Sequence, residues 1–388
     1  MAAALRIAML GQKGCPPLWG GIERHVTALA AALVARGHRV TVYARAPYRR
    51  EARARGLAAP PGVRVRVLPA VHTTHLEALT HTLAAAVAAA GSHDVLHFHG
   101  IGPGSVAALA RFLAPRARRV LTVHALDWQR AKWEPWAQAL LRRGEAVAVR
   151  CAHRVIAVSA DIAGYIEERY GIAAAVIRNG VDAPIVRPPG PCLAALGLAP
   201  RRYVLCVGRL VPEKGIHVLL DAFARLRTDW RLVVAGPAQD ARYARALRAS
   251  SSSCPRILLA GAFQGADLEE LYSHAGAFAL PSRTEGFPIA LLEAVSYGLP
   301  VVASDIPAVR EALAAAGAEG AELCAAGDAG ELAACLARVL ARPESARGRA
   351  SGAPAGLSWD AAAARTEQVY YETTASRDMA SGALDPYT

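Results

Sequence analysis

An arginine and a lysine occur in one segment of the chain at a spacing that suits a diphosphate ligand. The segment GRLVPEKG (Gly208–Gly215) directly follows a short apolar run at 203–207. Arg209 and Lys214, placed where a strand ends, could stabilise the negative charge on a diphosphate leaving group without a metal ion. Only three of the 44 basic residues are lysines, which indicates a geometric need for a compact ammonium group at position 214.

A second segment carries two carboxylates around an expected helix start. In EGFPIALLE (Glu285–Glu293), Pro288 suits the first helical position. Glu285 then lies in the preceding loop, and Glu293 lies about one and a half turns into the helix. N–H groups of the first helical turn can bind phosphate, and a carboxylate can accept hydrogen bonds from both hydroxyls of a ribose. This segment therefore also favours a nucleotide ligand.

Short apolar runs alternate with helical patterns in both halves of the chain, which predicts βαβ units and parallel sheets. Strands are expected at 5–10, 40–44, 63–68, 95–98, 120–123, 155–158, 175–177, 203–207, 231–235, 257–260, 277–280 and 301–303. Helices are expected at 22–36, 215–226, 288–297 and 357–372. The proline-rich stretch 185–192 has no periodicity and is the expected linker. We expect an α/β protein with two doubly wound Rossmann-like domains, 1–186 and 187–357, and a C-terminal helix and frayed tail at 358–388.

The loop after the first strand is a third candidate phosphate-binding device. It ends with Gly20 and Gly21 just before the helix at 22–36, so bare backbone N–H groups can approach an anion. Two prolines and Trp19 precede these glycines and make the loop stiffer than a plain glycine-rich one, so access of a second substrate there would be unusual. A tight turn without ligand is the alternative interpretation.

Several function classes do not fit the sequence. The first loop lacks G-x-G-x-x-G, no acid follows the second strand, and neither a P-loop nor a G-x-S-x-G motif is present. The seven cysteines are scattered without metal-ligand spacing, and no D-x-D pair occurs, so we expect no metal and no cofactor. The N-terminus shows no secretory signal, and no apolar run reaches the length of a membrane span, so a cytoplasmic protein is expected.

The charge is unevenly distributed. Residues 1–190 carry a formal net charge of +14, and the remainder carries −2. Such asymmetry suits an anionic partner, namely a phospholipid surface, a lipid-phosphate acceptor or nucleic acid, although a solvated arginine-rich surface is equally compatible. Trp128 and Arg130 belong to an aromatic and basic cluster that could stack on sugar rings or touch an anionic membrane, or could form a core-facing helix. No nucleic-acid module is recognisable, so nucleic acid is not expected as a partner.

Motifs along most of the chain carry a resemblance. GRLVPEKG (Gly208–Gly215), PSRTEGFPIALLEA (Pro281–Ala294) and GLPVVAS (Gly298–Ser304) resemble the signature of retaining GT-B glycosyltransferases of family 4. GQKG…WGGIERHV (Gly11–Val26) and HALDWQRAKW (His124–Trp133) are similar to a bacterial, rhamnosyltransferase-like subset. The resemblance implies a GT-B fold, in which two domains face each other across a cleft and the C-terminal helix returns to the N-terminal domain.

The resemblance also implies roles for individual residues. Arg209 and Lys214 would hold the donor diphosphate, Glu293 the ribose, and Glu285 the hydroxyls of the transferred sugar. His124, directly after the strand at 120–123, would contact the donor sugar at the reacting centre. Further donor contacts would come from residues that offer mainly backbone groups, which are Gly20, Gly21, Gly208, Ala262, Phe263, Gly286 and Phe287.

The expected activity is therefore metal-independent transfer of a hexose, with retention by front-face displacement. The donor would be a nucleoside-diphosphate sugar, with dTDP-rhamnose as the first candidate, and the acceptor a glycan, a lipid-linked sugar or a natural product. Glu285 and Glu293 share one loop and helix rather than flanking a scissile bond, which argues against a glycosidase. A sugar-nucleotide epimerase, a phosphorylase and a non-catalytic binding subunit are the alternatives. The expected location is cytoplasmic, with peripheral contact to the inner face of the plasma membrane as one option.

Overall fold

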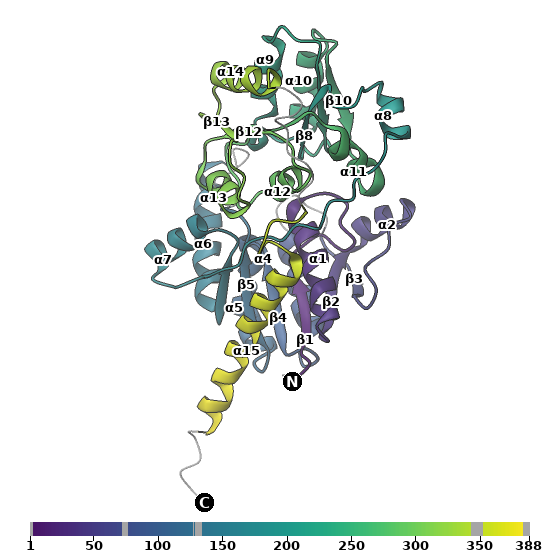
Figure 1. The fold of residues 1–388 in the computed structure, drawn as a ribbon. Helices are drawn as coiled ribbons and strands as arrows, with labels where there is room; N and C mark the ends of the chain where they lie inside the picture. Colours follow the sequence, from purple (N-terminus) through teal and green to yellow (C-terminus); the bar gives the residue numbers. More distant parts are fainter. Residues whose placement is uncertain (1–2, 72–76, 127, 129–133, 343–351, 383–388) are drawn as a thin grey trace, which may run out of the picture. The chain divides into compact units, whose positions relative to one another are not determined.

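The computed structural model describes residues 3–71, 77–126, 128, 134–342 and 352–382 (Figure 1). The chain divides into two compact units, Met1–Gly180 with Trp359–Thr388, and Val181–Ser358. Each unit contains one sheet of parallel strands. Among the described residues, no helix combines the length and apolar character that crossing a membrane requires.

The first unit is built on a sheet with the strand order β3-β2-β1-β4-β5-β6-β7. The central strands β1 and β4 are almost entirely buried, as expected for parallel strands that helices cover on both faces. The strands are β1 (Arg6–Leu10), β2 (Arg39–Arg45), β3 (Arg64–Leu68), β4 (Val95–His99), β5 (Arg118–Val123), β6 (Arg154–Ala157) and β7 (Ala175–Val176).

The helices of the first unit lie on two faces of this sheet. Right-handed crossovers place α1 and α2 on one face, and α3, α5, α6 and α7 on the other, because the chain reverses its direction across the sheet after β3. The helices are α1 (Gly21–Ala35), α2 (Ala46–Ala54), α3 (Glu77–Ala89), α4 (Ile101–Gly104), α5 (Ala107–Leu113), α6 (Pro135–Cys151) and α7 (Ala160–Tyr170).

The last helix, α15 (Trp359–Gly382), returns to the first unit and packs against α1 (Figure 1). Glu367 of α15 accepts hydrogen bonds from Arg36 at 2.6 Å and from His38 at 2.8 Å. Deeper in the unit, Tyr370 bonds to His97 of β4 at 2.6 Å. The expected return of the C-terminal helix is confirmed, although the helix extends to Gly382 rather than ending near residue 372.

The second unit repeats the architecture with the strand order β10-β9-β8-β11-β12-β13. Its strands are β8 (Tyr203–Val207), β9 (Arg231–Ala235), β10 (Ile257–Gly261), β11 (Ala277–Leu280), β12 (Val301–Ser304) and β13 (Glu322–Cys324). Its helices are α8 (Pro191–Leu196), the short 3₁₀ helix η2 (Pro212–Lys214), α9 (Ile216–Ala224), α10 (Ala241–Ser251), α11 (Gly265–His274), α12 (Ile289–Ser296), α13 (Pro307–Ala315) and α14 (Ala329–Leu340). The buried aromatic and aliphatic side chains of α9, β8 and β9 form one core with α14.

The division between the units differs from the expected boundary at 186 and 187. The Val181 N–H donates to the Leu357 carbonyl at 2.7 Å, so the two segments at which the chain passes between the units are paired directly. The expected linker is also partly helical, because α8 starts at Pro191, and a proline is readily accepted at a first helical position. The expected two doubly wound α/β domains are confirmed.

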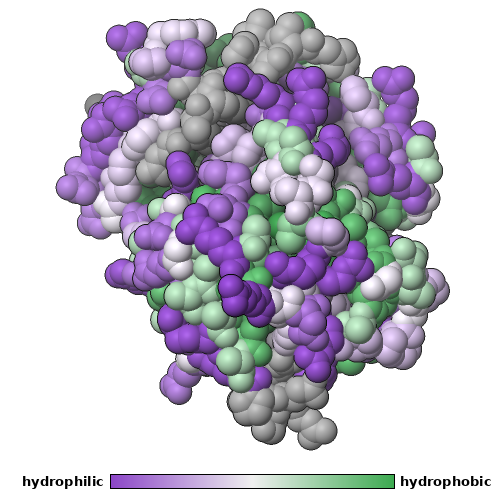
Figure 2. All heavy atoms as spheres, turned by 90° about the horizontal axis from the view of Figure 1, so that it is seen from above, coloured by the Kyte–Doolittle hydropathy of each residue, from purple (hydrophilic) through white to green (hydrophobic). Residues whose placement is uncertain are grey.

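One local expectation was wrong. Pro288 is the N-cap of α12 rather than its first residue, and the helix starts at Ile289. The arginine-rich segment after β2 forms α2, which begins at Ala46 with Pro47 in its first turn. On the face that Figure 2 draws, hydrophilic residues project between smaller hydrophobic areas, as expected when the apolar strands are buried.

Candidate functional site

The loops after β8 and β11 are bonded to each other at the carboxyl edge of the second sheet. β8 and β11 are neighbours in the sheet, and the Arg283 N–H donates to the Glu213 carbonyl at 2.9 Å. Gly215 has a φ of +63°, and a Cβ there would lie 2.0 Å from the Pro281 carbonyl oxygen. Only glycine fits this contact, which brings η2 against the loop that carries Glu285.

This arrangement joins two of the predicted site residues. Lys214 Nζ donates to Glu285 Oε1 at 2.5 Å, and Ser282 Oγ donates to the same oxygen at 2.7 Å. The Lys214 side chain is 20% exposed and that of Glu285 is 9% exposed, so the pair is largely but not fully shielded from solvent. A preorganised ammonium group that keeps some exposure is suited to binding an anion.

Arg209 lies on the same edge, two residues after β8. Its guanidinium donates to Gln239 Oε1 at 2.6 Å. Gln239 lies in the loop after β9, which is the strand on the other side of β8. Both predicted cations therefore follow β8, and each contacts a loop from a neighbouring strand.

Glu293 lies on α12 with 7% of its surface exposed. Its Oε2 accepts a hydrogen bond from the Tyr272 hydroxyl at 2.9 Å. The Tyr272 ring stacks on Tyr297 with 5.3 Å between centroids and an interplanar angle of 12°. Tyr272 was not predicted as a site residue, because nothing in the sequence pattern of α11 distinguishes it from an ordinary core aromatic. It fixes the position of the carboxylate that is expected to bind the ribose.

The predicted backbone contacts of the second unit follow the same edge. Gly208 follows β8, and its carbonyl oxygen would lie only 1.7 Å from a Cβ at Gly236, so no side chain fits at position 236. Gly236, also not predicted from the sequence, donates through its N–H to Gly261 at the end of β10. Ala262 and Phe263 come next in the chain and are half-buried. Gly286 and Phe287 follow Glu285 in the chain, directly before Pro288 and α12, and both are buried.

In the first unit, His124 belongs to a cluster of imidazoles. It follows β5, whereas His99 ends the neighbouring strand β4 and His25 lies on α1. His99 Nδ1 lies 3.2 Å from His124 Nε2, and the His25 and His124 rings meet edge to face with 4.6 Å between centroids. His25 Nδ1 bonds to Asn179 Oδ1 at 2.8 Å. His25 and His99 were not predicted, although a histidine at the end of an apolar run, as in 95–99, is a sequence signal that could have indicated this cluster.

The histidines of this cluster are neutral at pH 7. Burial lowers the pKa of His25 to about 4, against the opposing effect of its hydrogen bond to Asn179. Burial and neighbouring imidazoles hold the pKa values of His99 and His124 well below the ordinary value. His124 therefore acts as a neutral hydrogen-bonding group and not as a cation.

The three imidazoles are also the one group among the described residues with an arrangement that could hold a metal ion. Ring nitrogens of His25, His99 and His124 all lie within 4.8 Å of one another. Neutral imidazole is the form that binds divalent transition metals. None of these residues belongs to the diphosphate-binding loops of the second unit, and the expected metal-independent reaction stays a prediction.

The other predicted residues of the first unit have different surroundings. Gly20 is the N-cap of α1 with a φ of +108°, and a Cβ at Gly21 would meet no atom within 4 Å. Trp19 is half-buried under the Arg55 guanidinium, 4.7 Å from its ring centroid. Trp128 is covered in the same way by Arg142 at 4.3 Å. Arg130 lies outside the described residues.

Two family models match the chain. One, described as glycosyl transferases group 1, matches residues 201–342, and one described as glycosyltransferase family 4 matches residues 19–183. The chain is 31% identical to a glycogen synthase of Mycobacterium tuberculosis (strain CDC 1551 / Oshkosh), over 94% of each chain. An alpha-maltose-1-phosphate synthase of the same strain is 31% identical over 80% of this chain and 82% of its own. The lipopolysaccharide core biosynthesis mannosyltransferase LpsB of Rhizobium meliloti is 33% identical over 50% of this chain and 54% of its own chain.

Solved structures show the same fold. Sucrose-phosphate synthase from Thermosynechococcus elongatus has a TM-score of 0.79 at 22% identity and covers 96% of this chain and 100% of its own. Anabaena HepE, solved in complex with UDP-glucose, has a TM-score of 0.74 at 24% identity with the same two coverages.

Proposed function

This chain belongs to the group 1, family 4 glycosyltransferases, and from that premise we propose that it transfers a hexose from a nucleoside-diphosphate sugar with retention at the anomeric carbon. The observation that carries the proposal is the junction of the loops after β8 and β11. This junction holds Lys214 against Glu285, and Arg209 and the helix of Glu293 lie on the same edge of the sheet.

In the proposed reaction, Arg209 and Lys214 bind the donor diphosphate. The bond between the anomeric carbon and the diphosphate oxygen breaks while the acceptor oxygen forms its bond to the same face of that carbon. The acceptor proton goes to the departing phosphate oxygen, so no protein nucleophile is needed. Both cations stabilise the charge that grows on the leaving group and favour the transition state over the ground state.

The remaining predicted residues act on binding. Glu293, oriented by Tyr272, accepts hydrogen bonds from the ribose hydroxyls, and Glu285 accepts them from the sugar. Neutral His124 contacts the sugar at the reacting centre. Gly20, Gly21, Gly208, Ala262, Phe263, Gly286 and Phe287 supply further donor contacts, and Trp19, Trp128 and Arg130 are proposed for the acceptor side. The assignments in the second unit rest on the family motifs and on the geometry at the edge of its sheet, and those in the first unit rest on the sequence motifs alone.

The sugar and the acceptor are proposed at the level of class. The names of the relatives refer to glycogen, maltose-1-phosphate and mannosyl transfer. They therefore do not support rhamnose, which was our first candidate for the transferred sugar. We propose a hexose donor, with UDP-, ADP-, GDP- and dTDP-linked sugars as the set to test. The proposed acceptor is a glycan, a lipid-linked sugar or a natural product, in a cytoplasmic reaction.

A donor screen tests the proposal. Each nucleotide sugar is titrated by calorimetry and then incubated with the protein while release of the nucleoside diphosphate is measured, with a chelator present and absent. We expect one donor to bind in the micromolar range and to be turned over at the same rate with the chelator. Binding of no donor would refute the transferase proposal, and binding without release under every acceptor would favour a binding subunit. Loss of the rate with chelator would refute the metal-independent reaction.

A further inference from the structure

Large apolar side chains are exposed on one side of the first unit. Among the described residues, thirteen large hydrophobic side chains are exposed, and nine of them lie on the three helices α3, α5 and α6. Phe112 is 76% exposed, and Trp136 is 67% exposed. We call these nine residues the apolar face; they are Leu79, Leu83, Val87, Leu109, Phe112, Leu113, Trp136, Leu140 and Val147.

The fold brings these side chains together. The three helices lie on the same face of the first sheet, α3 contacts α5, and α5 contacts α6. Residues 79, 83 and 87 of α3 are spaced by four and share one side of the helix, whereas Ala85, Ala86 and Ala89 are buried against the sheet. The buried hydrophobic residues of α3 and α5 are all alanines, whereas the leucine, valine and phenylalanine side chains of these helices are exposed. This is the opposite of what core packing requires.

Exposed arginines lie on or directly after two of the three helices that carry the apolar face. Arg111 lies over the ring of Phe112, with its guanidinium carbon 5.5 Å from the centroid. The others are Arg116 after α5, and Arg142, Arg143 and Arg150 on α6. The acidic residues within the three helices are already paired with other side chains. Glu77 forms an ion pair with Arg45, and Glu145 accepts hydrogen bonds from the hydroxyls of Tyr165 and Tyr170. The exposed acids near these arginines and the adjoining α7 in the chain are Glu134, the N-cap of α6, and Asp161, Glu167 and Glu168 on α7.

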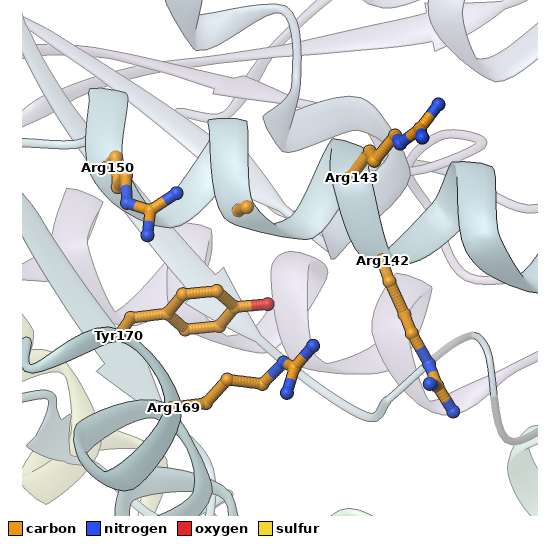
Figure 3. Close-up of a pocket in the computed structure, with 6 residues that line it drawn as sticks. Arg142, Arg143, Arg150, Arg169 and Tyr170 are labelled. Atoms are coloured by element: carbon orange, nitrogen blue, oxygen red, sulfur yellow. The ribbon is translucent and has the colours of Figure 1, made fainter.

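A cationic pocket adjoins the α6 end of this surface. Its volume is about 350 Å³, and Arg142, Arg143, Ala146 and Arg150 of α6 line it together with Arg169 and Tyr170 of α7. Figure 3 shows the guanidinium groups of Arg150 and Arg169 on either side of the Tyr170 ring. The Tyr170 hydroxyl donates to Glu145 at 2.6 Å, which keeps the ring in place between the arginines. Guanidinium groups bind phosphate oxygens in bidentate fashion, so the pocket suits a phosphate group.

We propose that the apolar face and the cationic pocket dock the first unit onto an anionic phospholipid bilayer. Exposed aromatic and aliphatic side chains flanked by arginines are the composition of a surface that enters the headgroup region, where the apolar groups reach the acyl chains and the cations meet lipid phosphates. A second copy of the chain is a poorer occupant, because a symmetric contact would place the same arginines against each other. Nucleic acid is poorer too, since it offers nothing to nine exposed apolar side chains.

Vesicle co-sedimentation of the full chain, without donor or acceptor, tests the docking independently of the proposed transfer. Vesicles are made of phosphatidylcholine alone or of phosphatidylcholine mixed with phosphatidylglycerol. The variants are Phe112→Ser with Trp136→Ser for the apolar face, Arg142→Gln with Arg143→Gln for the cations, and Arg242→Gln with Arg245→Gln on α10 of the second unit as the matched control. Circular dichroism checks that each variant is folded.

We expect binding to the mixed vesicles only, a decrease as salt is raised, and a loss of about fivefold per arginine replaced on α6. The serine variant should also bind weakly, whereas the α10 variant should bind as the parent does. Equal binding by all variants, or indifference to phosphatidylglycerol, would overturn the proposal. A dimer in gel filtration that the serine variant converts to monomer, without vesicle binding by the parent, would assign the face to a second copy instead.

Discussion

Lys214 and Glu285 are separated by 71 positions in the chain and form the shortest link between the two candidate loops. The carboxylate holds the ammonium group in place before a ligand arrives, which lowers the cost of orienting it in the transition state. The same pairing means that a donor diphosphate must compete with, or add to, the contact with Glu285. The affinity of the site for a diphosphate therefore depends on one contact between the two loops, from Lys214 Nζ to Glu285 Oε1.

Replacing either cation should reduce turnover strongly. In Lys214→Ala and Arg209→Ala we expect kcat to fall by about 10²- to 10³-fold, the usual effect of removing one donor to a developing oxyanion. Steady-state release of the nucleoside diphosphate measures this effect. Arg231→Ala, a substitution in the same unit outside both loops, is the control and should keep kcat close to that of the parent. Rates near the parent value in both cation variants would contradict the diphosphate role.

The ribose contact is tested better by Glu293→Gln than by alanine, because glutamine can still accept the hydrogen bond of the buried Tyr272 hydroxyl. We expect the dissociation constant for the nucleoside diphosphate to rise by about 10- to 100-fold, as for the loss of charge-assisted hydrogen bonds. Calorimetry measures it. Tyr272→Phe, which leaves the carboxylate in place, should have a smaller effect, and unchanged affinity in Glu293→Gln would exclude the ribose role.

At the scale of elements, the order of strands decides which loops meet. β8 lies between β9 and β11, so the loop that carries both cations can touch Gln239 on one side and Glu285 on the other. The motifs around positions 209 and 285 were recognisable in the sequence because they are local. Their contact was not, because strand order depends on packing between segments distant in the chain. The same reason explains why His25 and His99 were missed beside His124.

Gly215 tests how far the site depends on this junction. In Gly215→Ala the new Cβ would meet the Pro281 carbonyl at 2.0 Å in a backbone conformation that alanine disfavours. We expect the free energy of unfolding to fall by about 3 kcal/mol or more, with a loss of turnover. Urea unfolding measures it.

Gly197→Ala is the matched control. Gly197 has a similar φ of +60°, but the nearest atom that a Cβ there would meet belongs to a side chain, 3.6 Å away. This variant should lose only about 1–2 kcal/mol, the cost of the left-handed conformation alone. Equal losses in the two variants would show that contact with Pro281 is unimportant.

At the scale of the whole molecule, stability depends on histidines that are buried without charge. In the unfolded chain a histidine titrates near 6.5, whereas burial lowers the pKa of His25 to about 4 and that of His97 to about 3. Between these values the unfolded chain binds more protons than the folded one, so the free energy of unfolding must rise with pH. Acidification below pH 6.5 therefore destabilises the first unit.

Between pH 6.5 and 5, the free energy of unfolding should fall by up to about 1.4 kcal/mol per pH unit for each such histidine. Above pH 7.5 these histidines should make no contribution to the pH dependence. Urea unfolding across this range measures the slope. In His25→Phe the slope should be shallower by the contribution of one proton, while parent and variant should run parallel above pH 7.5. Identical slopes below pH 6.5 would show that His25 does not titrate between the two states.

The α/β class, the two halves, the charge asymmetry and the segments that carry the candidate cations and carboxylates could be predicted from the sequence, because each of these is a local pattern of residue types. The pairing of Lys214 with Glu285, the cluster of three histidines from β4, α1 and the position after β5, and the shared exposed side of the apolar residues on α3, α5 and α6 became known only from the folded structure. These are contacts between segments far apart in the chain. They arise from strand order and helix packing, which depend on the free energy of the whole unit. No short segment of the sequence contains enough information to predict them.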